Sequence, residues 1–172
     1  AGHDFCSREL IKAGADVNAT EEDDFTALMF ACQNGHDLCS RQLLKAGAQL
    51  ESKIRSGATA LILACQNGHE PCARALLECG ADVNAQKNDG FSALMAAVTA
   101  PTGSLCANIL LQHRATVDQT DRAKCTSLMH AAWQGRLDAV DMLLAARADV
   151  LMLRKGGTSA LMDAAAGGHE RV

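Results

Sequence analysis

The sequence contains few aromatic or rigid residues. Its 172 residues include no tyrosine, one tryptophan, four phenylalanines and two prolines. A core built around aromatic rings is therefore excluded, and the interior must consist of small and aliphatic side chains, which favours closely packed helices. Apolar residues make up 48% of the chain and charged residues 21%, a composition that excludes a disordered protein.

Positive charge is also scarce. Lys and Arg number 16 against 20 Asp and Glu, which gives a formal net charge of −4. Nucleic-acid-binding domains carry an excess of basic residues, so we expect no nucleic-acid partner. No apolar run reaches the roughly 18 residues of a membrane-spanning helix, so we expect no direct insertion into a membrane. The sequence has no G-x-S-x-G, no phosphate-binding glycine loop and no H-E-x-x-H, so we expect no enzyme activity, no catalytic residue and no cofactor.

What the sequence does contain is a repeat. Related blocks begin at Phe25 (FTALMFACQNGH), Ala58 (ATALILACQNGH), Phe91 (FSALMAAVTAPTG), Cys125 (CTSLMHAAWQGR) and Thr158 (TSALMDAAAGGH). A leucine-rich block such as LLECGADVNA, at Leu76, follows each of the first four, and a lone copy precedes them at Leu10. Self-similarity with a period of 33 or 34 residues indicates a solenoid of stacked units.

Each unit has the pattern of two helices separated by a turn. In residues 58–90, Thr59 is a candidate N-cap, and Leu61, Ala64 and Cys65 follow on one helical face. Gly68 interrupts this helix. A second helix carries Cys72, Leu76 and Leu77 on its buried side and ends near Gly80, which suits the left-handed conformation that follows a helix.

These units resemble the ankyrin repeat, whose pattern is G-x-T-P-L-H-x-A-A-x-x-G-H followed by a Leu-Leu helix and G-A-D-V-N-A. The residues of one unit that match it are Gly57, Thr59, Leu61, Ala64, Gly68, His69, Leu76, Leu77, Gly80, Ala81, Asp82, Val83, Asn84 and Ala85. The resemblance implies an all-α ankyrin-repeat solenoid of stacked helix-turn-helix units joined by β-hairpin-like loops. The family's histidine after the proline is replaced here by Met29, Ile62, Met95, Met129 and Met162, so a hydrophobic contact is expected in place of its hydrogen bonds.

We interpret residues 1–172 as a single array. Its units are 1–24, 25–57, 58–90, 91–124, 125–157 and 158–172, of which the first and last are incomplete. Solenoid ends normally carry polar capping units, and none is visible here. We therefore expect this array to be a segment of a longer protein. The uncapped residues Leu10, Ile11, Leu161 and Met162 make end-to-end association of the incomplete units possible.

Two turns contain two cysteines and a histidine each, in CQNGHDLC from Cys32 to Cys39 and CQNGHEPC from Cys65 to Cys72. This spacing superficially suggests zinc. The equivalent stretch AWQGRLDA in unit 125–157 contains none of these residues, so the turn does not require a metal. We expect no metal ligands here and interpret the cysteines as small, mostly buried hydrophobic residues without disulfides. Unpaired thiols favour a reducing intracellular compartment, cytoplasm or nucleus.

Function is expected where the units differ. The resemblance implies that the loop tips and the exposed side of each first helix line a concave surface, which commonly binds protein partners. The variable positions on it are Phe25, Gln33, Arg55, Gln66, Phe91, Arg122, Trp133 and Lys155, and we predict that they bind a protein partner. Exposed aromatic residues near arginine are typical of binding hot spots, although the three aromatics could instead pack on neighbouring units.

The main hypothesis is therefore a protein–protein interaction module or scaffold without catalysis. Two alternatives remain open. In the first, the array regulates an enzyme or channel whose active parts lie outside this chain; in the second, it is a structural spacer in a large assembly. The spacer predicts contacts on the convex surface or at the array ends, whereas the interaction module predicts a selective loss of binding when Trp133 is changed.

Overall fold

The computed structural model describes residues 2–169, and their side chains from Phe5 onward. The described residues form helices and loops, with no strand among them. The helices are α1 (Gly2–Lys12), α2 (Ala27–Gln33), α3 (Asp37–Lys45), α4 (Ala60–Gln66), α5 (Glu70–Glu78), α6 (Ala93–Thr99), α7 (Ser104–Gln112), α8 (Ser127–Trp133), α9 (Leu137–Ala145) and α10 (Ala160–Ala166). The predicted all-α repeat solenoid is confirmed.

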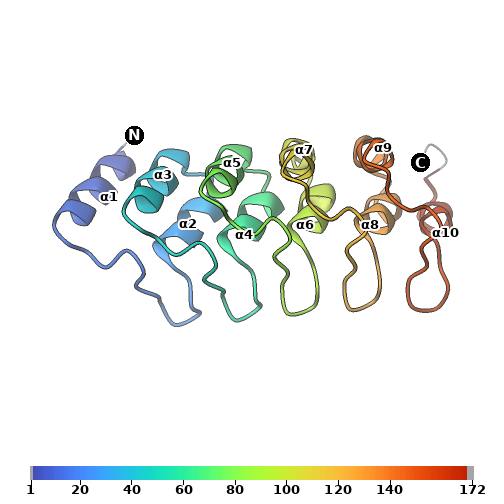
Figure 1. The fold of residues 1–172 in the computed structure, drawn as a ribbon, viewed down its shortest axis with the longest axis horizontal. Helices are drawn as coiled ribbons and strands as arrows, with labels where there is room; N and C mark the ends of the chain where they lie inside the picture. The colour runs from blue at the N-terminus through green and yellow to red at the C-terminus, as the bar shows by residue number, and fades with distance from the viewer. Residues whose placement is uncertain (1, 170–172) are drawn as a thin grey trace.

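The helices lie in two parallel rows (Figure 1). The first helices of the units, α2, α4, α6, α8 and α10, form one row, and α1, α3, α5, α7 and α9 form the other. Each helix packs against its neighbours within the row, and each helix from α2 to α9 also packs against its partner in the same unit. No helix in the described part of the chain is long and apolar enough to cross a membrane.

A hydroxyl residue starts each first helix. The caps are Thr26, Thr59, Ser92, Thr126 and Ser159, and each side-chain oxygen accepts a hydrogen bond from the backbone N–H three residues later. Met29 and Met95, which stand where the repeat pattern has histidine, are buried, as a hydrophobic replacement requires. Their sulfur atoms also accept a hydrogen bond from the N–H of Thr26 and Ser92, which the sequence did not predict.

The core runs the length of the array without interruption. Leucines at equivalent positions fill it from both rows, namely Leu28, Leu61, Leu94 and Leu128 from the first helices and Leu43, Leu76, Leu110 and Leu143 from the second. Alanines and cysteines fill the spaces between them, so neighbouring helices approach closely. The unit of construction is therefore a pair of short helices that cannot bury its apolar surface without the next pair.

A hairpin-like loop projects from each unit (Figure 1). Each loop tip is closed by a backbone hydrogen bond between its first and last residues, over residues 21–25, 54–58, 87–91, 121–125 and 154–158. Backbone bonds also join successive tips, for example from the N–H of Lys155 to the carbonyl oxygen of Ala123 at 2.8 Å. The tips and the exposed sides of the first helices together make a continuous surface, which we call the loop-and-first-helix face.

Candidate functional site

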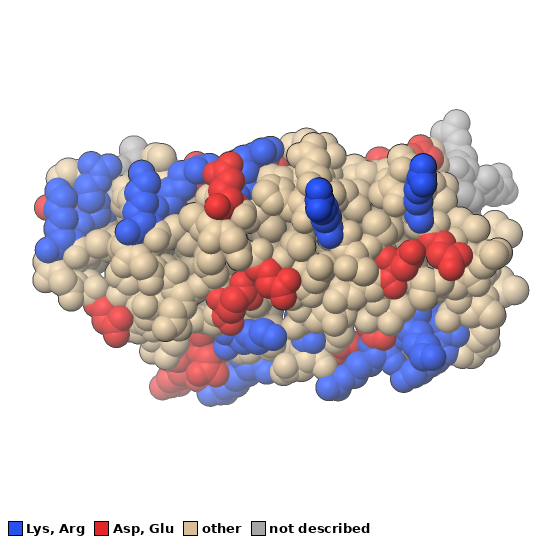
Figure 2. Space-filling model, in the orientation of Figure 1, with Lys and Arg blue, Asp and Glu red and all other residues tan. Residues whose placement is uncertain are grey.

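Charge is distributed unevenly over the loop tips. Acidic side chains gather at the N-terminal tip and basic side chains along the later tips (Figure 2). The first tip contains Glu21, Glu22, Asp23 and Asp24, and the later tips contain Arg122, Lys124, Arg154 and Lys155. A partner that lies along this face would meet charge of opposite sign at its two ends.

The predicted binding residues on the tips differ in whether their side chains already have partners within the array. Arg55 forms an ion pair with Asp23 at 3.0 Å and also donates to the carbonyl oxygen of Glu22, so it holds two tips together. Arg122 and Lys155 are exposed, and their side chains take part in none of the ion pairs found among the described residues. These two are the cations of the predicted set that remain available to a partner.

Phe25 and Phe91 are half-buried. The ring of Phe25 stacks on that of Phe30, with their centroids 4.9 Å apart. The ring of Phe91 meets the imidazole of His130 edge to face at 5.2 Å, and the Lys87 ammonium lies 5.3 Å from its centroid. Both phenylalanines therefore pack inside the array as well as facing outward, the alternative that the sequence left open.

Trp133 has a different environment. It is the last residue of α8, and 53% of its surface is exposed. Its carbonyl oxygen lies 3.0 Å from Nε2 of His169 in the next unit, which fixes the backbone at this point. At the equivalent positions Gln33 is half-buried, and Gln66 is exposed and accepts a hydrogen bond from Lys87. Trp133 is thus a large apolar side chain where the other units have small or polar ones.

A pocket of about 410 Å³ opens beside Trp133, between α8, α10 and two loop tips. Its lining consists of Cys125, Met129, His130, Trp133, Arg154 and Asp163. Of the predicted site residues, only Trp133 belongs to it. The predicted residues on earlier units are Phe25, Gln33, Arg55, Gln66 and Phe91. The predicted set is therefore spread along the face, whereas the pocket lies in its C-terminal part.

An ion pair forms one wall of this pocket. Nη2 of Arg154 lies 3.0 Å from Oδ1 of Asp163, and the Asp163 side chain is only 4% exposed. The hydrogen bond and the negative charge of Asp163 raise the pKa of Arg154 above its usual value. A buried carboxylate costs several kcal/mol unless it is paired, so Arg154 is needed where it lies.

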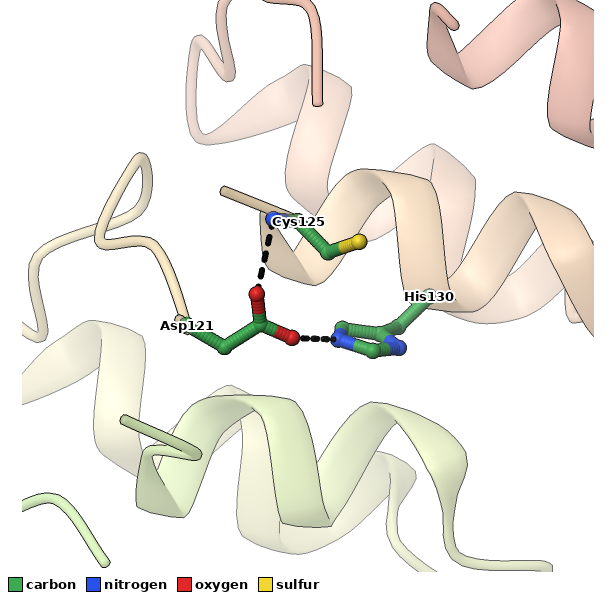
Figure 3. Close-up of side chains that lie close together, drawn as sticks. All are labelled: Asp121, Cys125 and His130. Carbon is green, nitrogen blue, oxygen red and sulfur yellow. Dashed lines mark hydrogen bonds and ion pairs between the residues drawn. The ribbon is translucent and has the colours of Figure 1, made fainter. Parts of the chain in front are cut away.

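A second group of polar side chains, Asp121, Cys125 and His130, connects the loop tip 121–125 to α8 (Figure 3). Oδ2 of Asp121 is 2.9 Å from Nε2 of His130, and Oδ1 accepts a hydrogen bond from the N–H of Cys125 at 2.9 Å. The carboxylate, the thiol and the imidazole come within 4.8 Å of one another. Burial, and then the charge of Asp121, raise the pKa of Cys125, so its thiol is protonated at neutral pH.

Sequence comparison missed these polar groups, although a signal existed. His130 and Asp163 occupy the position that holds Phe30, Leu63 and Ala96 in the other units. That position varies as much between units as the position of Trp133 does, and this variation is the signal. Their partners could not have been read from spacing, because the loop folds back to place residues nine positions apart in contact.

The cysteine-containing turns present no comparable group. In the part of the chain that the structure describes, the group of Asp121, Cys125 and His130 is the only one of three or more potential ligands with such close atoms. Cys32, Cys65, Cys72 and Cys106 are buried, as expected of small core residues. Cys39 is half-buried and Cys6 is exposed, so these two do not fit the buried position to which the repeat assigned them. Cys6 lies on α1, which has a neighbouring second helix on one side only.

Comparison with known proteins agrees with this architecture. A family model for ankyrin repeats matches in three overlapping copies, at residues 1–87, 44–121 and 85–154. A search of curated proteins found none that matches the chain. Ankyrin repeats are generally protein–protein interaction modules and are typically non-catalytic. Because the matches cover residues 1–154, and the two-helix units and their loops recur along the array, the chain belongs to the ankyrin repeat family.

Proposed function

We propose that this array binds a protein partner along the loop-and-first-helix face, with Trp133 as its apolar anchor. The observation that carries the proposal is an indole more than half exposed beside a pocket of about 410 Å³. Burying a tryptophan removes a large apolar area from water at little cost in conformational entropy. An apolar side chain of the partner would enter the pocket and pack against the indole.

Charge defines the chemistry of the partner around this anchor. Arg122 and Lys155 are exposed on the two loop tips that flank the pocket, 121–125 and 154–158. They favour a partner with acidic residues on either side of its apolar anchor. Such charges mainly set orientation and association rate, and their effect weakens with salt. The tip at Glu21–Asp24 adds the opposite preference at the far end of the face.

Truncating Trp133 tests this assignment. The chain and its Trp133→Ala variant would be used as baits in native lysate, and the proteins retained selectively by the parent chain would be identified and titrated against both. We expect Trp133→Ala to weaken binding by about 2 kcal/mol, the size typical of a hot spot, while circular dichroism stays unchanged. Gln66→Ala, at the aligned position in another unit, is the matched control and should cost far less.

The outcomes separate the proposal from its alternatives. If Trp133→Ala binds normally, or unfolds the protein, the indole is a packing residue and the anchor is wrong. If retained proteins instead cross-link to the row formed by α1, α3, α5, α7 and α9, the array acts as a structural spacer. An enzyme or channel domain joined to these units in a longer chain would favour the regulatory alternative, with the same face available to that domain.

We also propose that the array resides in a reducing compartment, cytoplasm or nucleus. Support comes from the cysteines, all eight of which are free thiols in the structure. Free thiols persist where glutathione and thioredoxin keep them reduced. Alkylation of the native protein at the moment of cell lysis should therefore modify its accessible thiols, and disulfide-linked forms at that point would contradict this location.

A further inference from the structure

We propose that Asp121, Cys125 and His130 form a zinc-binding site beside the pocket that Trp133 lines. The proposal is independent of any protein partner. Its starting point is geometric, because one carboxylate oxygen, one thiol sulfur and one imidazole nitrogen already lie within 4.8 Å of one another (Figure 3). A single ion at zinc–ligand distances of about 2.0–2.3 Å can reach all three once side-chain rotation brings these atoms closer together.

The donor set selects the metal. Calcium and magnesium bind through oxygen atoms alone, whereas sulfur and imidazole nitrogen suit zinc. Three protein ligands leave the fourth tetrahedral position open. Cys125 and His130 both line the pocket, so a water molecule could reach this position from the pocket.

All three ligands stand at positions that differ between units, and the position of Asp121 holds Glu21, Ile54, Lys87 and Arg154 in the other tips. Where this unit has Cys125, the others have Phe25, Ala58, Phe91 and Thr158, and where it has His130 they have Phe30, Leu63, Ala96 and Asp163. Hydrogen bonds that close the loop tip account for only one oxygen of Asp121. Oδ1 of Asp121 accepts from the N–H groups of Ala123 and Cys125, the role that Glu21 plays in the first tip. Oδ2, which contacts Nε2 of His130, and the side chains of Cys125 and His130 are the groups that would hold the ion.

The charges of the site balance when zinc binds. The Cys125 thiol releases its proton to solvent as the Zn–S bond forms, and the carboxylate of Asp121 supplies the second negative charge. Nε2 of His130 exchanges its contact with Oδ2 for the metal, which requires the imidazole proton to be on Nδ1. The nearby cation Arg154 is neutralised by Asp163, so the pocket presents no uncompensated positive charge to the ion.

The single tryptophan makes the site directly observable. Trp133 lines the same pocket as Cys125 and His130, so its fluorescence reports on binding there and not at the other cysteines. The metal-free chain would be titrated with zinc chloride under reducing conditions, following Trp133 emission and heat release. Cobalt chloride in a parallel titration would show a thiolate-to-cobalt charge-transfer band if sulfur is a ligand.

The repeat supplies substitutions that the fold already accepts. Cys125→Ala and His130→Ala introduce the residues found at the aligned positions Ala58 and Ala96. We expect the parent chain to bind one zinc ion, and each variant to bind at least about 100-fold more weakly, since losing even an outer-sphere partner costs 10–100-fold. Cys79→Ala, which removes an exposed thiol outside the group, should bind zinc as the parent does.

Two results would overturn the site. One is a Trp133 signal and heat of binding that do not change on adding zinc. The other is equal zinc affinity in the parent, Cys125→Ala and His130→Ala, which would place the ion on other cysteines. Circular dichroism of both alanine variants verifies that a loss of binding does not come from unfolding.

Discussion

Arg154 contacts Asp163 across nine positions of sequence, with Nη2 and Oδ1 3.0 Å apart. The same offset separates Asp121 from His130, whose Oδ2 and Nε2 are 2.9 Å apart. In both units the first residue of the loop tip folds back onto the first helix, and the contact is polar. Other units have different residues at these two positions, so the pair varies while the backbone of the unit stays the same.

The ion pair is expected to be replaceable only as a pair. Arg154→Ile leaves the buried carboxylate of Asp163 without a partner, so we predict a melting temperature lower by about 5 °C or more. Adding Asp163→Leu reproduces Ile54 and Leu63, the residues of unit 58–90 and its preceding tip, and should recover most of the loss. Thermal denaturation followed by circular dichroism decides. A double variant as unstable as the single one would show that the two positions are not coupled.

The sequence predicted the fold because each unit repeats its constraints. A hydroxyl residue at the helix start, leucines facing the core and glycines after the helices recur at fixed spacing, and the structure places each as expected, for example Thr59, Leu76 and Gly80. It also located the tips and the exposed position of Trp133. Both kinds of inference need only comparison between units.

The remaining features of the site could be found only from the three-dimensional structure. Whether Phe91 faces solvent or packs depends on His130 in the next unit, and no spacing rule relates the two. The pocket arises because residues from a first helix, a neighbouring first helix and two tips meet. Such contacts depend on how far each loop folds back, which local propensity does not determine.

Two glycines with similar backbone angles should differ in their tolerance of alanine. Gly80 has φ +90°, and a Cβ there would meet nothing within 4 Å. Gly57 has φ +83°, and its Cβ would meet the backbone nitrogen of Asn88 at 2.7 Å. Gly80→Ala should therefore cost only the backbone strain, about 1 kcal/mol of unfolding free energy.

Gly57→Ala should cost more, roughly 2–3 kcal/mol, because it also displaces the Asn88 N–H from the carbonyl oxygen of Ser56. Urea denaturation of both variants measures the difference. Equal losses would mean that the contact between tips contributes nothing beyond the conformational strain.

Thiol reactivity should divide the cysteines by environment. Hydrogen bonding with Cys72 and burial raise the pKa of Cys32, and Cys106 and burial do the same for Cys65. Since the thiolate is the reactive form, iodoacetamide should modify the exposed Cys79 in the native protein and leave Cys32 and Cys65 unmodified even at pH 9. Peptide mapping by mass spectrometry tests this, with protein unfolded in guanidinium as the control for full labelling.

The same shifts give a pH dependence of stability. The hydrogen bonds that raise the pKa values of Cys32 and Cys65 lower those of Cys72 and Cys106, but all four thiols are buried, and burial opposes ionisation of each. We therefore expect the raised pKa values to set the sign, so that the stability is fully present below the unfolded-state thiol pKa of about 8.5. It is lost progressively as pH rises from there toward the folded-state values. Denaturation at pH 7.5 and 9.5 should show the decrease. Rapid labelling of Cys32 at pH 9 in folded protein would contradict the burial itself.

Apolar residues on α10 should make the isolated chain self-associate. Leu161 is 74% exposed and Met162 is also exposed, beside an apolar groove of about 250 Å³ that contains Val140 and Leu144. At the other end of the array, Leu10 on α1 is exposed as well. A contact between these two different surfaces is heterologous, so it would extend into short filaments rather than stop at a dimer.

Charge substitutions at each end distinguish this mode of association. Leu161→Glu and Leu10→Glu should each reduce the weight-average mass seen by sedimentation equilibrium toward the 18.1 kDa monomer, because either one removes half of every contact. Leu105→Glu changes an equally exposed leucine in the middle of the array and should leave association unchanged. Loss with Leu161→Glu alone would indicate that two copies of α10 pair with each other. A monomeric parent chain at all concentrations would show that neither end surface is adhesive.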